Sequence, residues 1–102
     1  MAKDPRLSMA TLKVLGALME HGANEFSGAE ISKKTGQPSG TLYPILTRLE
    51  AAGWLASRWE DGEPSAMGRP RRRLYKVTTV GRVKAQCVGA TVRADLGGLA
   101  WA

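Results

Sequence analysis

The most informative part of the chain is residues 39–53, which read SGTLYPILTRLEAAG. Apolar residues recur at 42, 45, 46 and 49, the i, i+3, i+4, i+7 spacing of one buried helical face. Ser39 is the expected N-cap, and Gly53 the expected end of this helix. The opposite face carries only small side chains, those of Gly40, Pro44, Thr47 and Ala51. A flat face of this kind lets a helix enter a DNA major groove, which is about 12 Å wide.

Two shorter helices are expected before this one. Ser8 can cap the first, which runs to about Glu20 and is followed by a turn at residues 21–24. The second begins at Ser27, because Ser27 and Glu30 have the spacing of a capping box, and Gly36 ends it. Helix, tight turn and helix at this spacing predict a helix-turn-helix.

The pattern changes after residue 53. Residues 54–60 and 71–77 are expected strands, joined by a polar loop at 61–68. Thr78 or Thr79 begins a last helix. The predicted fold is therefore mainly α with a two-stranded β-wing, a winged helix-turn-helix in the order helix-helix-helix-strand-strand-helix. Residues 1–78 form the expected DNA-binding domain, and residues 79–102 form a C-terminal dimerisation helix.

The last helix carries two apolar stripes. The first, expected to face inward, contains Val80, Val83, Cys87, Ala90 and Ala94, and the second contains Val88, Val92, Leu96 and Leu99. Because one small domain cannot bury both stripes, one is expected to pack on the chain's own core and the other on a two-fold partner. The candidate dimer-interface residues are Val80, Val83, Cys87, Val88, Val92, Leu96 and Leu99.

Positive charge is concentrated in one short segment. The chain has fifteen Lys and Arg residues against nine Asp and Glu, a net charge of +6. Five of the positive charges lie at Arg69, Arg71, Arg72, Arg73 and Lys76, with no acid among them. A projecting loop of guanidinium groups suits backbone phosphates or the narrow minor groove of DNA. A solvated run of charge is the alternative interpretation.

Other kinds of chemistry find little support in the residues. His21 and Cys87 are the single histidine and the single cysteine, so neither a disulfide nor a tetrahedral metal centre is expected. Glu60, Asp61 and Glu63 lie in an expected loop, where they are interpreted as solvating the wing tip rather than as catalytic groups. No cofactor and no enzyme activity are predicted. The apolar stretches are too short to span a bilayer, so a cytoplasmic protein is expected.

Two blocks of sequence resemble the PadR family of transcriptional regulators. The first is GTLYPILTRLE at 40–50 followed by Gly53-Trp54-Leu55, and the second is GRPRRRLYKVT at 68–78 followed by Gly81. The similarity covers residues 7–86, and the C-terminal part is short, with Gly97-Gly98 interrupting its helix. The resemblance implies a dimeric winged helix-turn-helix that binds a palindromic operator and usually represses. Some relatives bind flat aromatic compounds at the dimer interface.

By match of position, the resemblance places DNA contacts on the third helix and on the wing. The candidate DNA-binding residues are Ser39, Gly40, Thr41, Tyr43, Pro44, Thr47, Arg48, Arg69, Arg71, Arg72 and Arg73. Of these, Thr41, Tyr43 and Thr47 can hydrogen-bond to phosphates or bases. Trp59 and Trp101 are candidates for lining a flat site for a small aromatic effector between subunits, with ordinary packing as the alternative.

The prediction from sequence is a sequence-specific DNA-binding regulator, a repressor that acts as a homodimer on a palindromic operator. Two other functions stay open. One is a winged-helix adaptor or anti-repressor that binds protein, against which the arginine segment argues. The other is a sensor that acts mainly through a small aromatic ligand, which quenching of tryptophan fluorescence would favour.

Overall fold

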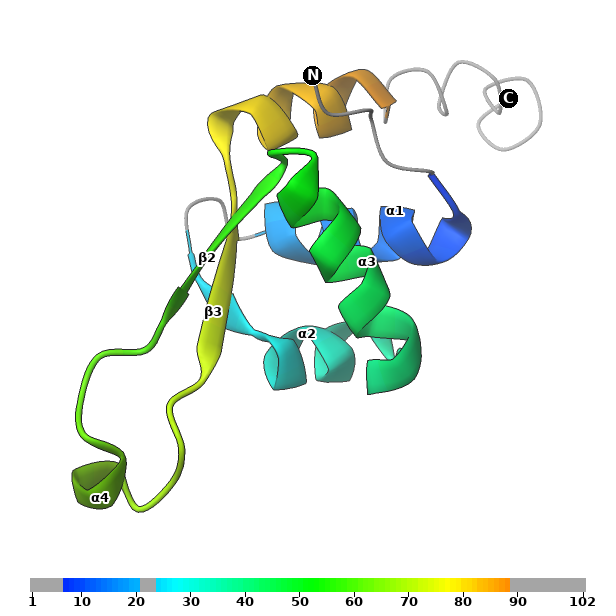
Figure 1. The fold of residues 1–102 in the computed structure, drawn as a ribbon. Coiled ribbons are helices and arrows are strands. Elements are labelled where there is room, and N and C mark those ends of the chain that lie inside the picture. Colours follow the sequence, from blue (N-terminus) through cyan, green and yellow to red (C-terminus); the bar gives the residue numbers. More distant parts are fainter. Residues whose placement is uncertain (1–6, 21–23, 89–102) are drawn as a thin grey trace.

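Three helices enclose the core of this domain: α1 (Met9–Met19), α2 (Gly28–Thr35) and α3 (Ser39–Ala51) (Figure 1). The computed structural model describes residues 7–20 and 24–88. The turn expected at residues 21–24 lies almost wholly outside these residues. The helices and the strands that follow them confirm the predicted winged helix-turn-helix.

The helix ends follow the capping signals closely. Ser8 is the N-cap of α1, and its side chain accepts a hydrogen bond from the Thr11 backbone N–H. Ser27 and Glu30 form the predicted capping box, and Gly36 ends α2 in the left-handed conformation, with φ of 72°. A glycine suits that position because it has no Cβ to oppose a positive φ.

The beginning of α3 differs by one residue from the prediction. Pro38, not Ser39, is the N-cap, and no side chain caps this helix. The extended backbone of Pro38 turns its carbonyl toward the N–H groups of Thr41 and Leu42, each 3.0 Å away. Ser39 is therefore the first helical residue, and α3 ends at Ala51 rather than Gly53, which has φ of 82°.

The apolar core forms where the inner faces of the three helices meet the sheet. The predicted stripe of α3 is confirmed, since Leu42, Ile45, Leu46 and Leu49 are all buried. Trp54, directly after α3, is 1% exposed and is among the largest fully buried side chains. The remaining buried apolar residues come from α1, α2 and the strands: Val14, Leu15, Leu18, Phe26, Ile31, Leu55, Tyr75 and Val77.

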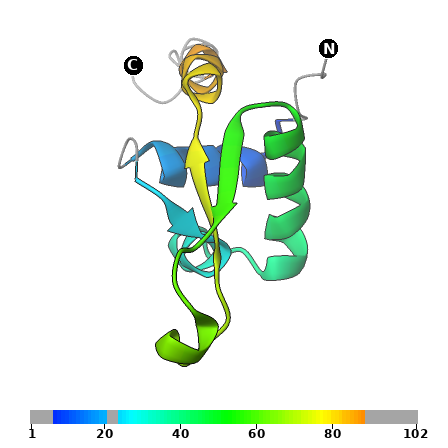
Figure 2. The ribbon, with the colours of Figure 1, turned by 60° about the vertical axis from the view of Figure 1, so that its left-hand side comes forward.

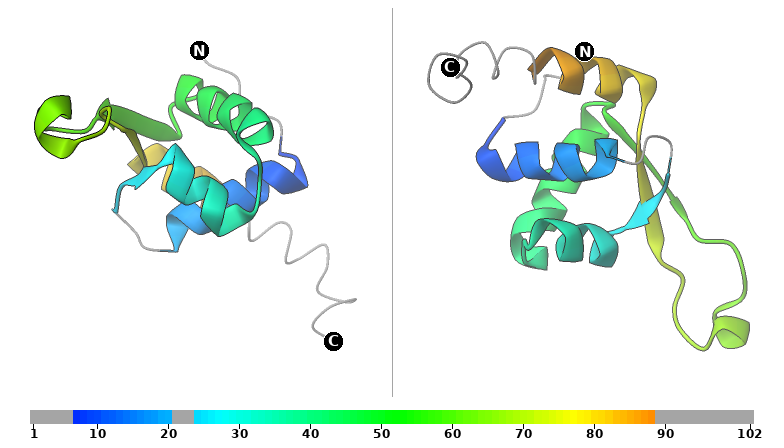
Figure 3. Two further views of the ribbon diagram at one scale, coloured as in Figure 1. Left: turned by 90° about the horizontal axis from the view of Figure 1, so that it is seen from below. Right: turned by 180° about the vertical axis from the view of Figure 1, so that it is seen from behind.

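The sheet contains three antiparallel strands in the described residues, one more than predicted. β2 (Leu55–Trp59) and β3 (Arg73–Val77) form the wing, and β1 (Phe26–Ser27) pairs with the other edge of β3. β1 was not predicted because a strand of two residues is too short to show an alternation of apolar and polar side chains. In addition, Ser27 is the N-cap of α2. The expected loop at 61–68 contains a single helical turn, α4 (Pro64–Met67), at the projecting end of the wing (Figures 1 and 3).

The last helix crosses the end of the sheet opposite the wing loop (Figures 1 and 2). It is helical from residue 79 to residue 88, the end of the described part. Thr78 is its cap, since the Thr78 hydroxyl accepts from the Gly81 N–H at 2.9 Å. Gly81 is buried against the carbonyl of Trp54, where an added Cβ would overlap backbone atoms.

The expected orientation of this helix is wrong in its described part. Val80 and Val83 are 54% and 55% exposed, and Cys87 is exposed, so the stripe expected to face inward faces outward. Ala85 and Val88 pack against the core instead. The reason is the close approach of Gly81 to Trp54, which turns the face containing residues 81, 85 and 88 inward. Residues 90, 92, 94, 96 and 99 lie outside the described residues.

No helix in the described ranges is long and apolar enough to cross a membrane.

Candidate nucleic-acid interface

The outward face of α3 is the first part of the candidate interface. Every α3 residue singled out from the sequence is exposed: Ser39, Gly40, Thr41, Tyr43, Pro44, Thr47 and Arg48. Pro44 has no N–H to donate to the carbonyl of Gly40. Because both residues are exposed, that carbonyl stays accessible to water, and α3 continues through Pro44 to Ala51.

Arg69 and Arg71 at the wing are engaged by neighbouring groups. Arg69 donates two hydrogen bonds to the carboxylate of Glu60, at 2.6 and 3.0 Å. This bonding lowers the pKa of Glu60 to about 2. Arg71 donates to the Gly62 carbonyl at 2.6 Å and lies 3.7 Å from a Glu63 oxygen. The acids interpreted as mere solvation of the wing tip therefore bind its arginines.

Arg73 connects the wing to the last turns of α3. Its Nε donates to the hydroxyl of Ser57 at 2.9 Å, and that hydroxyl donates to Glu50 of α3 at 2.5 Å. The guanidinium also lies 3.7 Å from Glu50 and 5.1 Å from the centre of the Trp59 ring. These contacts couple the position of the wing to that of α3.

Arg72 differs from the other three arginines. Its backbone is fixed, because its N–H donates to Glu60 at 3.3 Å and its carbonyl accepts from the Glu60 N–H at 2.8 Å. Its guanidinium is exposed and has no hydrogen bond or ion pair with any residue that the structure describes. Arg72 is thus held in place by its main chain while its charge stays available.

A further ion pair fixes the other side of the wing. Arg58 on β2 donates to both carboxylate oxygens of Glu25, each at 2.7 Å, and this bonding lowers the pKa of Glu25. Since Glu25 directly precedes β1, the pair joins two outer strands of the sheet. Pairs this exposed contribute little to stability, so its main effect is on the orientation of the wing.

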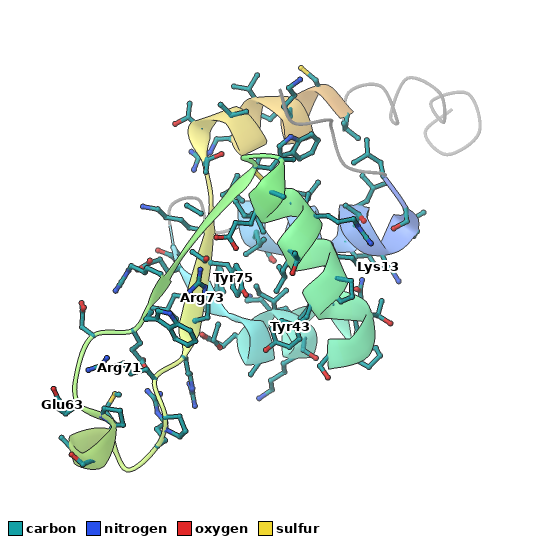
Figure 4. All side chains as sticks on the ribbon, in the orientation of Figure 1. Lys13, Tyr43, Glu63, Arg71, Arg73 and Tyr75 are labelled. Carbon is teal, nitrogen blue, oxygen red and sulfur yellow. The ribbon has the colours of Figure 1, made fainter. Side chains whose placement is uncertain are left out.

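A hollow of about 400 Å³ lies between α2, α3 and the wing. We call it the wing hollow, and it is lined by residues 27–29, Tyr43, Trp59, residues 71–73 and Tyr75. Figure 4 shows Tyr43, Arg73 and Tyr75 on the same side of the molecule, between α3 and β3. The wing hollow therefore brings Tyr43 of the predicted α3 contacts together with three of the predicted wing arginines.

Several residues of this region were missed from the sequence. Glu50 and Ser57 position Arg73, and Gly28 lies beneath the ring of Tyr43, where an added Cβ would overlap that ring. Glu50 and Ser57 are ordinary polar residues of a helix and a strand. No local pattern marks them, because their partners lie far away in the sequence.

The structure describes only some of the candidate dimer-interface residues and one of the two candidate ligand-site tryptophans. Among the candidate dimer residues, Val80, Val83 and Cys87 are exposed and Val88 packs on the core. Trp59 is 58% exposed on β2, at the wing hollow and on a different element from the last helix. Trp101 lies outside the described residues.

Comparison with known proteins then settles the family. The model of the "Transcriptional regulator PadR-like family" matches residues 12–86, which is most of the chain. The chain belongs to the PadR-like family of transcriptional regulators. The predicted resemblance is therefore confirmed. No curated protein sequence matches it.

Solved structures of PadR proteins share the fold. A PadR family transcriptional regulator from Eggerthella lenta DSM 2243 is 28% identical with a TM-score of 0.67, over 84% of this chain and 76% of its own. Bacillus subtilis PadR in complex with operator DNA is 18% identical with a TM-score of 0.62. That match covers 78% of this chain and 46% of the Bacillus protein.

A third similar structure concerns a regulator that responds to a small molecule. Bordetella bronchiseptica BpsR, whose DNA binding is regulated by 6-hydroxynicotinic acid, is 25% identical with a TM-score of 0.68. The match covers 95% of this chain and 70% of BpsR.

Proposed function

We propose that this PadR-like chain is a sequence-specific DNA-binding repressor that acts as a homodimer on a palindromic operator. One observation carries the proposal: Tyr43 on the exposed face of α3 and three wing arginines, Arg71, Arg72 and Arg73, line the same hollow. α3 then enters the major groove while the wing follows the adjacent backbone. The operator complex of Bacillus subtilis PadR, which has the same fold, supports this arrangement.

The two elements have different roles in this proposal. Thr47 lies on the exposed face of α3, where its hydroxyl and methyl groups are available to base edges. Arg72 carries a charge that suits a phosphate, and phosphate contacts position the protein without reading sequence. Sequence preference therefore comes from α3, and much of the affinity comes from the wing.

A homodimer follows from the outward face of the last helix. Val80 and Val83 are more than half exposed and lie three residues apart on one helical face with Cys87. A second copy that covers this face gives a two-fold interface and sets two α3 helices about one DNA turn, roughly 34 Å, apart. A near-palindromic site is the consequence.

Selection of binding sites from random duplex DNA tests the proposal, using the full chain. We expect one palindromic sequence to be enriched. Thr47→Ala should then weaken binding to that sequence by roughly 1–3 kcal/mol, with little loss on unrelated DNA. A pool that shows no enrichment after repeated rounds would refute sequence-specific binding and would favour an adaptor that binds protein.

A further inference from the structure

The wing hollow contains two hydrogen-bond donors without an acceptor among the described residues. One is the guanidinium of Arg72 on the wing, and the other is the hydroxyl of Tyr43 on α3. Both side chains are exposed, and Tyr43 retains 45% of its surface. The hollow is thus lined on two sides by groups able to bind one acceptor.

The charges around the hollow favour an anionic acceptor. Arg71 and Arg73 also line it, but each lies within 3.7 Å of a carboxylate oxygen, from Glu63 and Glu50 respectively. Arg72 has no such partner in the part of the chain that the structure describes. None of the described residues that line the hollow is acidic. An anion placed there meets a guanidinium that forms no ion pair or side-chain hydrogen bond in the described residues, and such a group binds phosphate through strong charge-assisted hydrogen bonds.

The position of the hollow identifies the source of the anion. It separates α3 from the wing, the two elements that contact DNA in the proposed function. In the proposed function, a DNA strand that runs beside α3 toward the wing passes this space. The first turn of α2 borders it too, and the positive end of a helix dipole adds to the attraction.

We propose that the wing hollow binds a single phosphate of the DNA backbone, held between the Arg72 guanidinium and the Tyr43 hydroxyl. This proposal rests on the proposed function and assigns the wing arginines unequal roles. Arg72 binds DNA, whereas Arg69 and Arg73 hold the wing in the position that presents Arg72, and Arg71 binds Gly62 and Glu63 within the wing loop. Gly28 keeps Tyr43 in place, because a larger residue would displace the ring.

Single neutralised phosphates provide the test. The duplex obtained by selection is prepared as a series in which one phosphate at a time is replaced by a methylphosphonate, and each duplex is titrated with the full chain. In the wild type, methylphosphonate at one position in each half-site should lower affinity on the order of tenfold, because the phosphate at that position contacts Arg72. Arg72→Gln should bind the unmodified duplex about as weakly, and should lose most of the sensitivity at that position, with the remainder due to Tyr43.

Arg71→Gln is the matched control, since Arg71 is already bound to Gly62 and Glu63. This variant should keep the tenfold sensitivity at the same phosphate. Tyr43→Phe should lose part of it. Thermal unfolding confirms that each variant is folded, and Arg72→Gln removes no side-chain hydrogen bond or ion pair that the structure describes.

Three results would contradict the proposal in different ways. If Arg72→Gln loses as much affinity as the wild type at every methylphosphonate position, the phosphate does not bind in the wing hollow, although the proposed DNA binding is unaffected. If Arg71→Gln loses the effect as completely as Arg72→Gln, the unequal roles are wrong. If the wild type enriches no DNA at all, the proposed function fails and this inference fails with it.

Discussion

The hydroxyl end of the Tyr43 side chain on α3 lies against Gly28, the first residue of α2, where any Cβ would overlap it. Tyr43 is exposed and belongs to the face proposed to contact DNA. Gly28 belongs to a different helix and is buried. A buried residue of a different helix therefore decides where a side chain of the proposed DNA face lies.

Gly28→Ala should lower DNA affinity without weakening the fold. The new Cβ displaces the exposed side chain of Tyr43, while the first position of α2 also accepts alanine. We expect affinity to fall by about fivefold to tenfold, the loss of roughly one hydrogen bond, and the unfolding midpoint to change little. In a Tyr43→Ala background the same substitution should cause no further loss, and an undiminished loss there would show that Gly28 acts by another route.

Gly81→Ala should destabilise the domain. The added Cβ would overlap the backbone of Trp54, so the helix from residue 79 must move away from the core. We expect a loss of about 1–3 kcal/mol in the free energy of unfolding, measured by denaturant titration. Gly16→Ala is the control, because nothing lies within 4 Å of its added Cβ in α1 and the substitution should be neutral or stabilising. Equal effects from both would contradict the packing described for the last helix.

Val83→Asp should separate the proposed dimer while leaving each chain folded. Val83 is 55% exposed in one chain, so the charge is unfavourable only where a second copy covers it. Sedimentation at micromolar concentration should show a wild-type dimer and a Val83→Asp monomer with a similar unfolding midpoint.

Val88→Asp provides the contrast, since Val88 packs on the chain's own core. This change should lower the unfolding midpoint of the chain itself. A Val83→Asp protein that still sediments as a dimer would place the interface elsewhere.

The Glu60–Arg69 pair makes the wing sensitive to acid. The pKa of Glu60 in the folded chain is about 2, below its ordinary value of 4.5, so the carboxylate stabilises the fold above pH 4.5. This contribution is lost as the pH falls from about 4.5 to about 2. The difference in unfolding midpoint between wild type and Glu60→Gln should therefore be largest above pH 5 and should shrink through that range. A difference that is constant with pH would show that the pair does not stabilise the wing.

Much of the fold and the candidate DNA face could be predicted from local patterns. The spacing of Leu42, Ile45, Leu46 and Leu49 fixes which side of α3 is buried, and the exposed face follows from that helical geometry. The capping box of Ser27 and Glu30, and the glycine at 36, mark the ends of α2 by interactions within a few residues. Such signals depend on neighbours along the chain, so the sequence alone determined them.

The partners of the wing arginines were decided by the tertiary structure. In the sequence, Arg69, Arg71, Arg72 and Arg73 look alike, a run of charge without acids. In the structure, three of them meet Glu60, Glu63 and Glu50 across a turn or a helix–strand contact, and the guanidinium of Arg72 alone among the four has no ion-pair partner in the described residues. The orientation of the last helix was decided in the same way. Two apolar stripes are equivalent by periodicity, and only the contact between Gly81 and the carbonyl of Trp54 selects which of them faces the core.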